Sequence, residues 1–198
     1  MATYSRVLNF KPDLTGYSQT WRHKTAVFTP ENGVTTKDTK RNPILSVTKM
    51  DISMKVSPIR QTDNERLENL LRLVFTEDNG VVGVPLWYSV DSLSVNASTA
   101  STSITIGIGS TNGEYAIPAG GYRDIMISSG DYTYAFSSTV SNISSGTLTL
   151  GSAPNLNYRI GTIVTPIIGM KIRDVVKSAG NRYNARGYSY SFEFEEID

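Results

Sequence analysis

The chain has 198 residues and a net charge of +1, because 19 lysines and arginines nearly balance 18 aspartates and glutamates. This balance gives no electrostatic drive toward nucleic acid, and no stretch approaches the ~20 apolar residues that span a membrane. Cysteine is absent, which excludes disulfides, thiolate catalysis and cysteine-based zinc sites, and which suits assembly in a reducing cytoplasm. We therefore expect a globular protein with no nucleic-acid partner and no membrane segment.

The first strand that the pattern predicts is Trp21–Phe28. The polar and aromatic segment before it contains turn signals at residues 11–13 and at Thr15-Gly16. A second strand is predicted at Ile44–Val56, because apolar residues alternate along it. Those expected on its buried face include Met50, Ile52, Met54 and Val56.

Residues 62–77 are predicted to form the one long helix, since apolar residues recur at helical spacing. The residues expected on its buried face are Leu67, Leu70, Leu71, Val74 and Phe75. Thr62 and Glu65 have the spacing of a capping box, and Asn79-Gly80 is a typical helix end. We expect this helix to lie across a sheet; the alternative is a surface helix between two β-domains.

After the helix, Val81–Val90 is an apolar run that Pro85 limits to an edge strand or a broken strand. From residue 89 the composition changes to Ser, Thr and Gly with short aliphatic stretches. Regularly spaced short strands in such a region are typical of a small sandwich or barrel. The predicted strands are Ser103–Ile108, Asp124–Ser128, Tyr132–Phe136 and Thr147–Leu150. We interpret residues 89–162 as an inserted β-module; the alternative is one continuous, larger barrel.

The C-terminal part resumes the earlier composition with a strand at Ile163–Arg173. Residues 174–187 are predicted to form an exposed loop or hairpin arm, and Tyr188–Ile197 a final strand with aromatic residues on one face. A terminal strand of this kind is expected to pair with an early strand. Residues 1–88 and 163–198 are thus predicted to form a main domain around the insertion. The predicted fold is mainly β, an antiparallel sandwich or barrel-like domain with one long helix and a small inserted β-module.

The chain offers few groups for catalysis. Its single histidine, His23, lies in a predicted strand and is expected to be structural, and no nucleophile-elbow or zinc-protease motif occurs. The glycines of residues 107–113 lack the spacing of a phosphate loop and indicate a β-turn. The carboxylates of Asp124 and Asp131 and of the C-terminal strand show no spacing that would pair them for glycoside hydrolysis. We expect a protein that is not an enzyme and that has no catalytic residues, bound cofactor or metal.

Tyrosine is the over-used residue, with 11 in the chain. Four tyrosines of the inserted region are candidates for a carbohydrate-binding or protein-binding surface, because their rigid amphipathic rings make favourable contacts. These candidates are Tyr115, Tyr122, Tyr132 and Tyr134. The alternative is that each is half-buried in a small β core.

Five features occur in a fixed order along the chain. The first two are the segment Trp21-Arg-His-Lys-Thr25 with a turn at Glu31-Asn-Gly33, and Lys40-Arg41-Asn42-Pro43 before a long strand. The others are the helix followed by Gly83-Val-Pro85-Leu-Trp87, an inserted module with Gly130-Asp131, and Tyr158-x-x-Gly161-Thr162-x-x-x-Pro166. In this pattern the chain resembles the distal-tail type of tail-tip protein of long-tailed bacteriophages and its relatives in gene-transfer particles. The resemblance covers most of the chain.

This resemblance implies a structural role in the virion tail, with assembly in the host cytoplasm. The chain would form a homo-oligomeric ring that extends the tail tube and anchors other tail proteins, namely hub or receptor-binding components; a host-surface glycan is a further candidate partner. Residues 1–20, 34–43 and 174–187 are candidate inter-subunit arms, with Lys40, Arg41, Arg182 and Arg186 as contact residues; the alternative is solvated loops. Two other functions remain open: a head–tail joining or tail-completion protein, and a non-catalytic carbohydrate-binding module.

Overall fold

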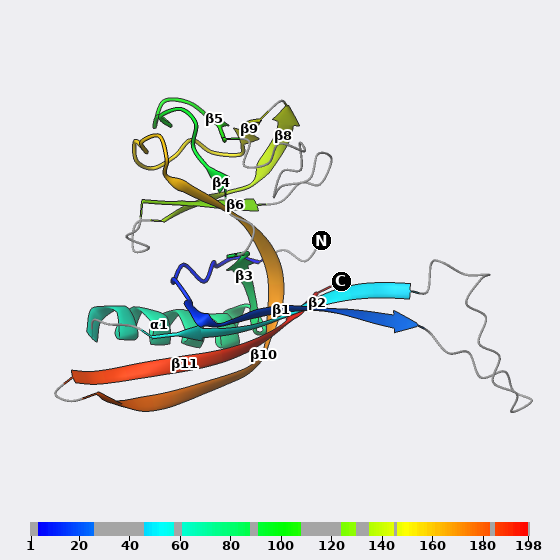
Figure 1. Ribbon diagram of the computed structural model, residues 1–198, viewed down its shortest axis with the longest axis vertical. Coiled ribbons are helices and arrows are strands. Elements are labelled where there is room, and N and C mark those ends of the chain that lie inside the picture. Colours follow the sequence, from blue (N-terminus) through cyan, green and yellow to red (C-terminus); the bar gives the residue numbers. More distant parts are fainter. Residues whose placement is uncertain are drawn as a thin grey trace, which may run out of the picture.

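The computed structural model describes residues 4–25, 46–57, 61–87, 91–107, 124–129, 135–144, 146–182 and 185–197. In this part the protein is mainly β, with antiparallel sheets and one helix, as the sequence predicts. Figure 1 shows a bent molecule in which one long strand, β10, runs from the upper end to the lower end. The elements in chain order are β1 Asp13–Thr25, β2 Ser46–Val56, α1 Gln61–Glu77, β3 Val81–Pro85, β4 Asp91–Ser92, β5 Ser103–Thr105, β6 Asp124–Ser128, β7 Phe136–Ser138, β8 Val140–Ser144, β9 Thr147–Leu150, β10 Ile163–Arg182 and β11 Ala185–Glu196.

Two sheets contain these strands. The eight-stranded sheet has the order β1-β2-β11-β10-β6-β7, and β3 and β4 also pair with β10. The second sheet has the order β5-β9-β8. The final strand pairs with β2, for example Phe192 with Met54 and Phe194 with Ile52, which confirms that it joins an early strand.

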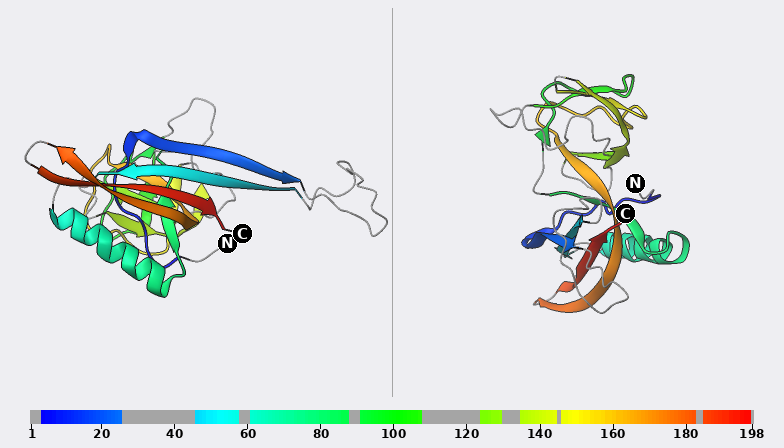
Figure 2. Two further views of the ribbon diagram at one scale, coloured as in Figure 1. Left: turned by 90° about the horizontal axis from the view of Figure 1, so that it is seen from below. Right: turned by 90° about the vertical axis from the view of Figure 1, so that its right-hand side faces the viewer.

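In the lower half of the molecule, α1 covers strands along which buried and exposed residues alternate (Figures 1 and 2). Tyr190, Phe192 and Phe194 are almost fully buried, and successive rings stack with centroids 6.3 and 5.5 Å apart. The predicted inward residues of β2, Met50 to Val56 at every second position, are also buried. Period-two alternation therefore predicted this face correctly, because each strand has one wet and one dry side.

The helix differs from its predicted form in two respects, its first residue and the burial of Phe75. It begins at Gln61, so Thr62 lies inside the first turn, and Glu65 accepts a hydrogen bond from the side chain of Gln61. The predicted capping box is wrong for this reason. Leu67 and Val74 are buried and Leu70 and Leu71 half-buried, whereas Phe75 is 51% exposed.

The predicted end of the helix is confirmed. Asn79 and Gly80 have positive φ angles of 53° and 78°, the left-handed conformation that closes a helix. The amide of Gly80 donates to the carbonyl of Val74 at 3.0 Å. The chain then enters β3, which ends at Pro85 as the broken apolar run predicted.

The first strand begins eight residues earlier than predicted, at Asp13, and the turn predicted at Thr15-Gly16 is wrong. The pairing of β1 with β2 shifts register between Asp13 and Ser18, as in a β-bulge. Gly16 lies at this shift, where a Cβ atom would come within 2.7 Å of the Cβ of Lys55. The glycine therefore permits close strand contact here and does not end the strand.

Two clusters of buried side chains occupy the two ends of the molecule. The first includes residues from α1, β2, β3 and β11, and the second includes Leu93, Ile104, Leu148 and Val164. We call the parts around them the helical lobe and the Ser/Thr lobe, the latter comprising the described residues from 91 to 162. Strand β6 separates the clusters, because Met126 belongs to the first and Ile125 and Ile127 to the second. The pairing of Ile163–Ile167 with β6 crosses the predicted boundary at residues 162 and 163, and the division into domains stays a prediction.

In the Ser/Thr lobe, β6 and β9 have their predicted bounds. Strand β5 ends at Thr105, and β7 begins at Phe136, the last residue of a predicted strand that otherwise lies mostly outside the described residues. Strand β8 was not predicted, because Val140–Ser144 carries too few apolar residues to give a pattern. Residues 174–187 lie in the β10–β11 hairpin, which confirms the hairpin arm and excludes the loop.

Candidate functional site

The end of the β1–β2 hairpin is a two-stranded ribbon that extends away from the rest of the fold (Figures 1 and 2). Trp21–Thr25 pairs with residues 46–50, from Trp21 opposite Met50 to Thr25 opposite Ser46. Strand β11 pairs with β2 only from Asp51 to Val56. Among the described residues, no strand pairs with either outer edge of this ribbon. The edges of the ribbon are therefore available to another chain. Pairing there would also stabilise the ribbon, because isolated two-stranded hairpins are only marginally stable in water.

The register also places basic residues together in this ribbon. Arg22 lies opposite Lys49, and Lys24 follows two positions along β1, opposite Val47.

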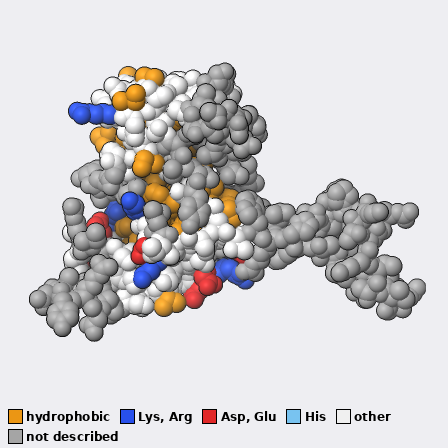
Figure 3. Space-filling model, viewed as in Figure 1, with side chains coloured by type: hydrophobic (Ala, Val, Ile, Leu, Met, Phe, Trp, Pro, Cys, Tyr) orange, Lys and Arg blue, Asp and Glu red, His pale blue; other side chains and the backbone are white. Residues whose placement is uncertain are grey.

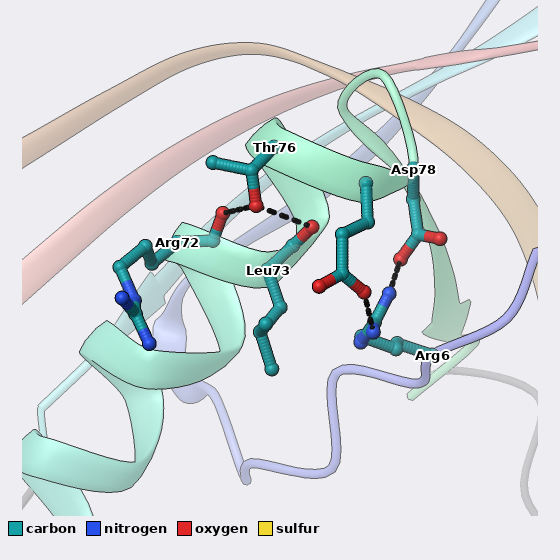
Figure 4. A network of polar contacts seen from close by, with 6 residues as sticks. Arg6, Arg72, Leu73, Thr76 and Asp78 are labelled. Atoms are coloured by element: carbon teal, nitrogen blue, oxygen red, sulfur yellow. Dashed lines mark hydrogen bonds and ion pairs between the residues drawn. The ribbon is translucent and has the colours of Figure 1, made fainter.

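The N-terminal segment, residues 4–12, closes one side of the helical lobe. Leu8 donates its amide to the carbonyl of Gly83 and Gly83 donates to Arg6, both at 2.8 Å. The guanidinium of Arg6 pairs with Glu77 and Asp78 at the end of α1 (Figure 4). Its pKa is raised above the ordinary arginine value, chiefly by the hydrogen bond to Asp78. These contacts fasten the segment to both α1 and β3.

Tyr4 connects this segment to the Ser/Thr lobe. Its hydroxyl donates to the carboxylate of Asp124, the first residue of β6. Burial, and then the hydrogen bond to Asp124, raises the pKa of Tyr4 above the ordinary tyrosine value. The tyrosine ring covers Gly83, where a Cβ atom would lie 2.5 Å from it. The fit requires glycine at this position.

A polar cluster joins α1 to the β10–β11 hairpin. The hydroxyl of Tyr190 lies 2.6 Å from Asn64 Oδ1 and 2.9 Å from Glu68 Oε1, and Lys177 pairs with Glu68. Lys177 also lies over the ring of Tyr188, 4.0 Å from its centroid. The hydrogen bonds from Lys177 and then Tyr190 lower the pKa of Glu68. The same ion pair raises the pKa of Lys177. These contacts position the helix on the hairpin.

A depression opens on the Ser/Thr lobe between the end of β6 and the segment before β10. It has a volume of about 520 Å³ and is lined by residues 128–129 and 156–163. Arg159 is the one charged residue in this lining. The carbonyl of Arg159 accepts a hydrogen bond from the amide of Thr162 at 3.1 Å.

Exposed apolar side chains line the depression. Leu156, Ile160 and Ile163 are 45, 64 and 40% exposed, and Val95, on the segment paired with residues 158–162, is 57% exposed. Hydrogen bonds join Leu93 to Thr162 and Ala97 to Tyr158, which brings Val95 level with Ile160. Figure 3 shows hydrophobic side chains at the outer end of this lobe, where charged ones are few. Clustered apolar exposure of this kind marks a binding surface more often than an isolated exposed residue does.

The structure places only some of the predicted contact residues. Arg182 and Arg186 lie near the tip of the β10–β11 hairpin, in register with Ala185 and Asn181. His23 lies in β1 opposite Thr48. The four candidate tyrosines of the inserted region and the arm residues Lys40 and Arg41 lie outside the described residues. The predicted surface formed by Tyr115, Tyr122, Tyr132 and Tyr134 therefore stays a prediction.

Sequence reasoning missed Arg159 and the depression around it. One signal was available, because Arg159 is the single lysine or arginine between residues 124 and 170. The depression itself was not visible, since residues 128–129 and 156–163 are separated in the sequence and come together only in the fold.

Comparison of the chain with known protein families and with curated proteins finds no match. Within the described ranges, no helix is long and apolar enough to cross a membrane. In the same part of the chain, histidine and carboxylate side chains form no group of three that could hold a metal ion.

Proposed function

We propose that the chain is a structural subunit of a phage tail tip that associates with copies of itself into a ring. In this proposal the ring extends the tail tube and carries hub or receptor-binding components. The sequence resemblance to distal-tail proteins supports the role, and the ribbon supports the mode of assembly. A closed ring needs two different surfaces on each subunit, one of which receives what the other presents.

The observation that carries the proposal is the projecting β1–β2 ribbon. Its outer edges pair with no other described strand, although β1 and β2 continue in regular register for eight pairs from Ser18 to Thr25. The part of β1 before Ser18 is interrupted by the bulge, a device that discourages edge pairing. The outer edge of β1 is therefore regular only from Ser18 to Thr25, the part that includes the ribbon. Strand addition to such an edge supplies main-chain hydrogen bonds between subunits.

The ribbon is also basic in sequence. Arg22 and Lys49 occupy register positions across from each other, and Lys24 follows in β1. In a ring, this composition would suit an acidic surface of the neighbouring subunit, an attraction that weakens with salt.

The experiment compares the mass of the full-length chain in solution with that of a shortened variant. Replacing residues 22–49 by Asn-Gly joins Trp21 to Met50, which lie opposite each other, through a turn that suits a hairpin. We expect the wild-type mass to rise with concentration to a fixed multiple of 21.7 kDa, with rings in negative-stain images. The shortened variant should keep one subunit's mass.

The matched control shortens the other hairpin. Replacing residues 181–186 by Asn-Gly joins Gly180 to Gly187 and removes Arg182 and Arg186. This variant should still associate, because the proposal assigns association to the ribbon and not to the predicted contacts of Arg182 and Arg186. Association of the variant without the ribbon, or a wild-type chain that stays a monomer at every concentration, would contradict the proposal.

A further inference from the structure

The depression on the Ser/Thr lobe has the dimensions of a ligand site. Its volume of about 520 Å³ falls within the ~300–1,000 Å³ typical of pockets for small molecules. It lies between Ser129, after β6, and the segment that leads into β10. In Figure 1, β6 lies in the upper half of the molecule, whereas the ribbon projects sideways from the lower half. A ligand there would not compete with ribbon pairing.

Hydrogen bonds hold the lining segment in place. Ala97 and Tyr158 exchange backbone hydrogen bonds of 2.8 and 3.0 Å on one side of Arg159. On the other side, the amide of Ile160 donates to Asn96 Oδ1 at 2.8 Å. The hydroxyl of Tyr158 donates to Asn155 at 2.9 Å. The site is therefore formed before any ligand binds, which lowers the entropy cost of binding.

Arg159 gives the site a single positive charge. Its side chain is exposed, and no hydrogen bond or ion pair joins it to another described residue. Arg6 and Arg173, in contrast, pair with carboxylates of the helical lobe. A guanidinium forms two parallel hydrogen bonds with a carboxylate. Because no second cation lines the depression in the described part of the chain, a singly charged carboxylate fits better than a doubly charged phosphate.

The remaining lining suits a sugar ring. Asn157 Oδ1 accepts a hydrogen bond from the backbone amide of Thr99 at 3.0 Å. The side-chain NH₂ group of Asn157 has no hydrogen-bond partner among the described residues and can donate to a ligand. Ser129 and Thr162 add hydroxyls, and Ile160 and Ile163 add exposed apolar surface. Polar groups that orient a ligand, set beside apolar surface, are the usual composition of a small-molecule site. Sugars present hydroxyls at their edge and C–H groups on their face.

We propose that this depression binds a sugar that carries a carboxylate, with Arg159 pairing with the carboxylate and Asn157 donating to a ring substituent. The site goes beyond the proposed ring assembly, because it lies on the other lobe and requires one subunit only. It would let the chain contact an acidic surface glycan directly.

The test is titration of the full-length chain with sugars, with binding monitored by calorimetry or ligand-observed NMR. The probes are N-acetylneuraminate, glucuronate and galacturonate, with glucose and galactose as neutral counterparts and acetate as a free carboxylate. We expect at least one acidic sugar to bind at least tenfold more tightly than its neutral counterpart. Acetate should compete only weakly, because it lacks the ring contacts. Failure of all three acidic sugars to bind would overturn the proposal.

Two variants locate the site. Arg159→Gln should weaken the acidic sugar at least tenfold, and Arg159→Lys should retain part of the affinity. Asn157→Asp keeps the acceptor for Thr99 but replaces the NH₂ donor by a negative charge. This charge would repel the carboxylate of the sugar, so the variant should also abolish binding. Arg72→Gln, at an exposed position of α1, is the matched control and should bind normally. Unchanged binding by Arg159→Gln, or equal binding of neutral sugars, would refute the assignment.

The same titration on the variant that lacks residues 22–49 separates this proposal from ring assembly. Binding should persist there even though association is lost. Retained association with retained binding would contradict assembly through the ribbon alone, whereas loss of sugar binding in this variant would contradict a site that needs one subunit only.

Discussion

The two lobes are stabilised in different ways. The helical lobe has a stacked aromatic core and is fastened by ion pairs, such as Arg6 with Asp78 and Lys177 with Glu68. In the described part of the Ser/Thr lobe no ion pair occurs, and its core is mainly aliphatic, with Tyr158 and half-buried Phe136. Its outer end exposes apolar side chains instead.

This contrast indicates a division of roles. Ion pairs and large aromatic side chains hold α1 on the sheet, and this rigidity suits the ring subunit that we propose. A surface with few charges and exposed apolar groups is better suited to contact with a ligand or partner. Strand β6 belongs to both cores, so changes in one lobe can be compared with their effect on the other.

The largest expected effect is from Phe192→Ala. Phe192 is 1% exposed, and truncation should lower the free energy of unfolding by about 3–5 kcal/mol, since a cavity remains. Amide exchange should speed up in α1 and β11 and change little in β9. Phe75→Ala is the control of the same residue type, and its 51% exposure predicts a small effect. Equal loosening of β9 would show that the lobes open as one unit.

Gly83→Ala should disturb the packing of Tyr4, whose hydroxyl links the N-terminal segment to Asp124. The new methyl group would lie 2.5 Å from the ring of Tyr4 and 2.9 Å from Ile167 Cγ2. Such overpacking costs about 1–3 kcal/mol, measured by urea unfolding. Combining it with Tyr4→Ala should recover part of the loss, because the ring is the nearest obstacle. Strict additivity of the two changes would mean that Tyr4 does not cover Gly83.

Tyr190→Phe tests the polar contact between α1 and the sheet. The change keeps the aromatic ring but removes the hydroxyl that lies 2.6 Å from Asn64. We expect a loss of about 1 kcal/mol, the usual net value of a buried hydrogen bond. A variant as stable as the wild type would show that the hydroxyl adds nothing to the packing of the ring.

The smallest expected effect is a pH dependence from Glu68. Its pKa is lowered in the folded state by Lys177 and Tyr190, so the unfolded chain binds a proton more readily as the solution becomes acidic. The stabilisation is therefore present at neutral pH and fades as the pH falls through and below the ordinary glutamate range. Unfolding midpoints at several pH values should show the advantage of the wild type over Glu68→Gln shrinking in acid. An advantage that grows in acid would have the wrong sign.

The sequence predicted the helical lobe better than the Ser/Thr lobe for physical reasons. Alternation in β2 and β11 and the 3.6-residue period of α1 are strong because each element buries one face. In the Ser/Thr lobe, strands β5 to β9 are three to five residues long, which is too short for a period to emerge.

The candidate sites depended on features that the sequence does not contain. The ribbon is visible only once β11 is found to stop at Asp51 of β2. The depression requires residues 93–97 to pair with residues 158–162. Local errors had local causes: Gly16 is accommodated in a bulge, and Gln61 extends the helix past the expected cap.

The measurement that tests the central claim most directly is amide hydrogen exchange of the wild-type chain below and above its association concentration. If subunits join through the ribbon, amides of residues 18–25 and 46–50 should gain protection on association, while amides of β5, β8 and β9 keep theirs. Association that protects other strands and leaves the ribbon unchanged would contradict assembly through this edge.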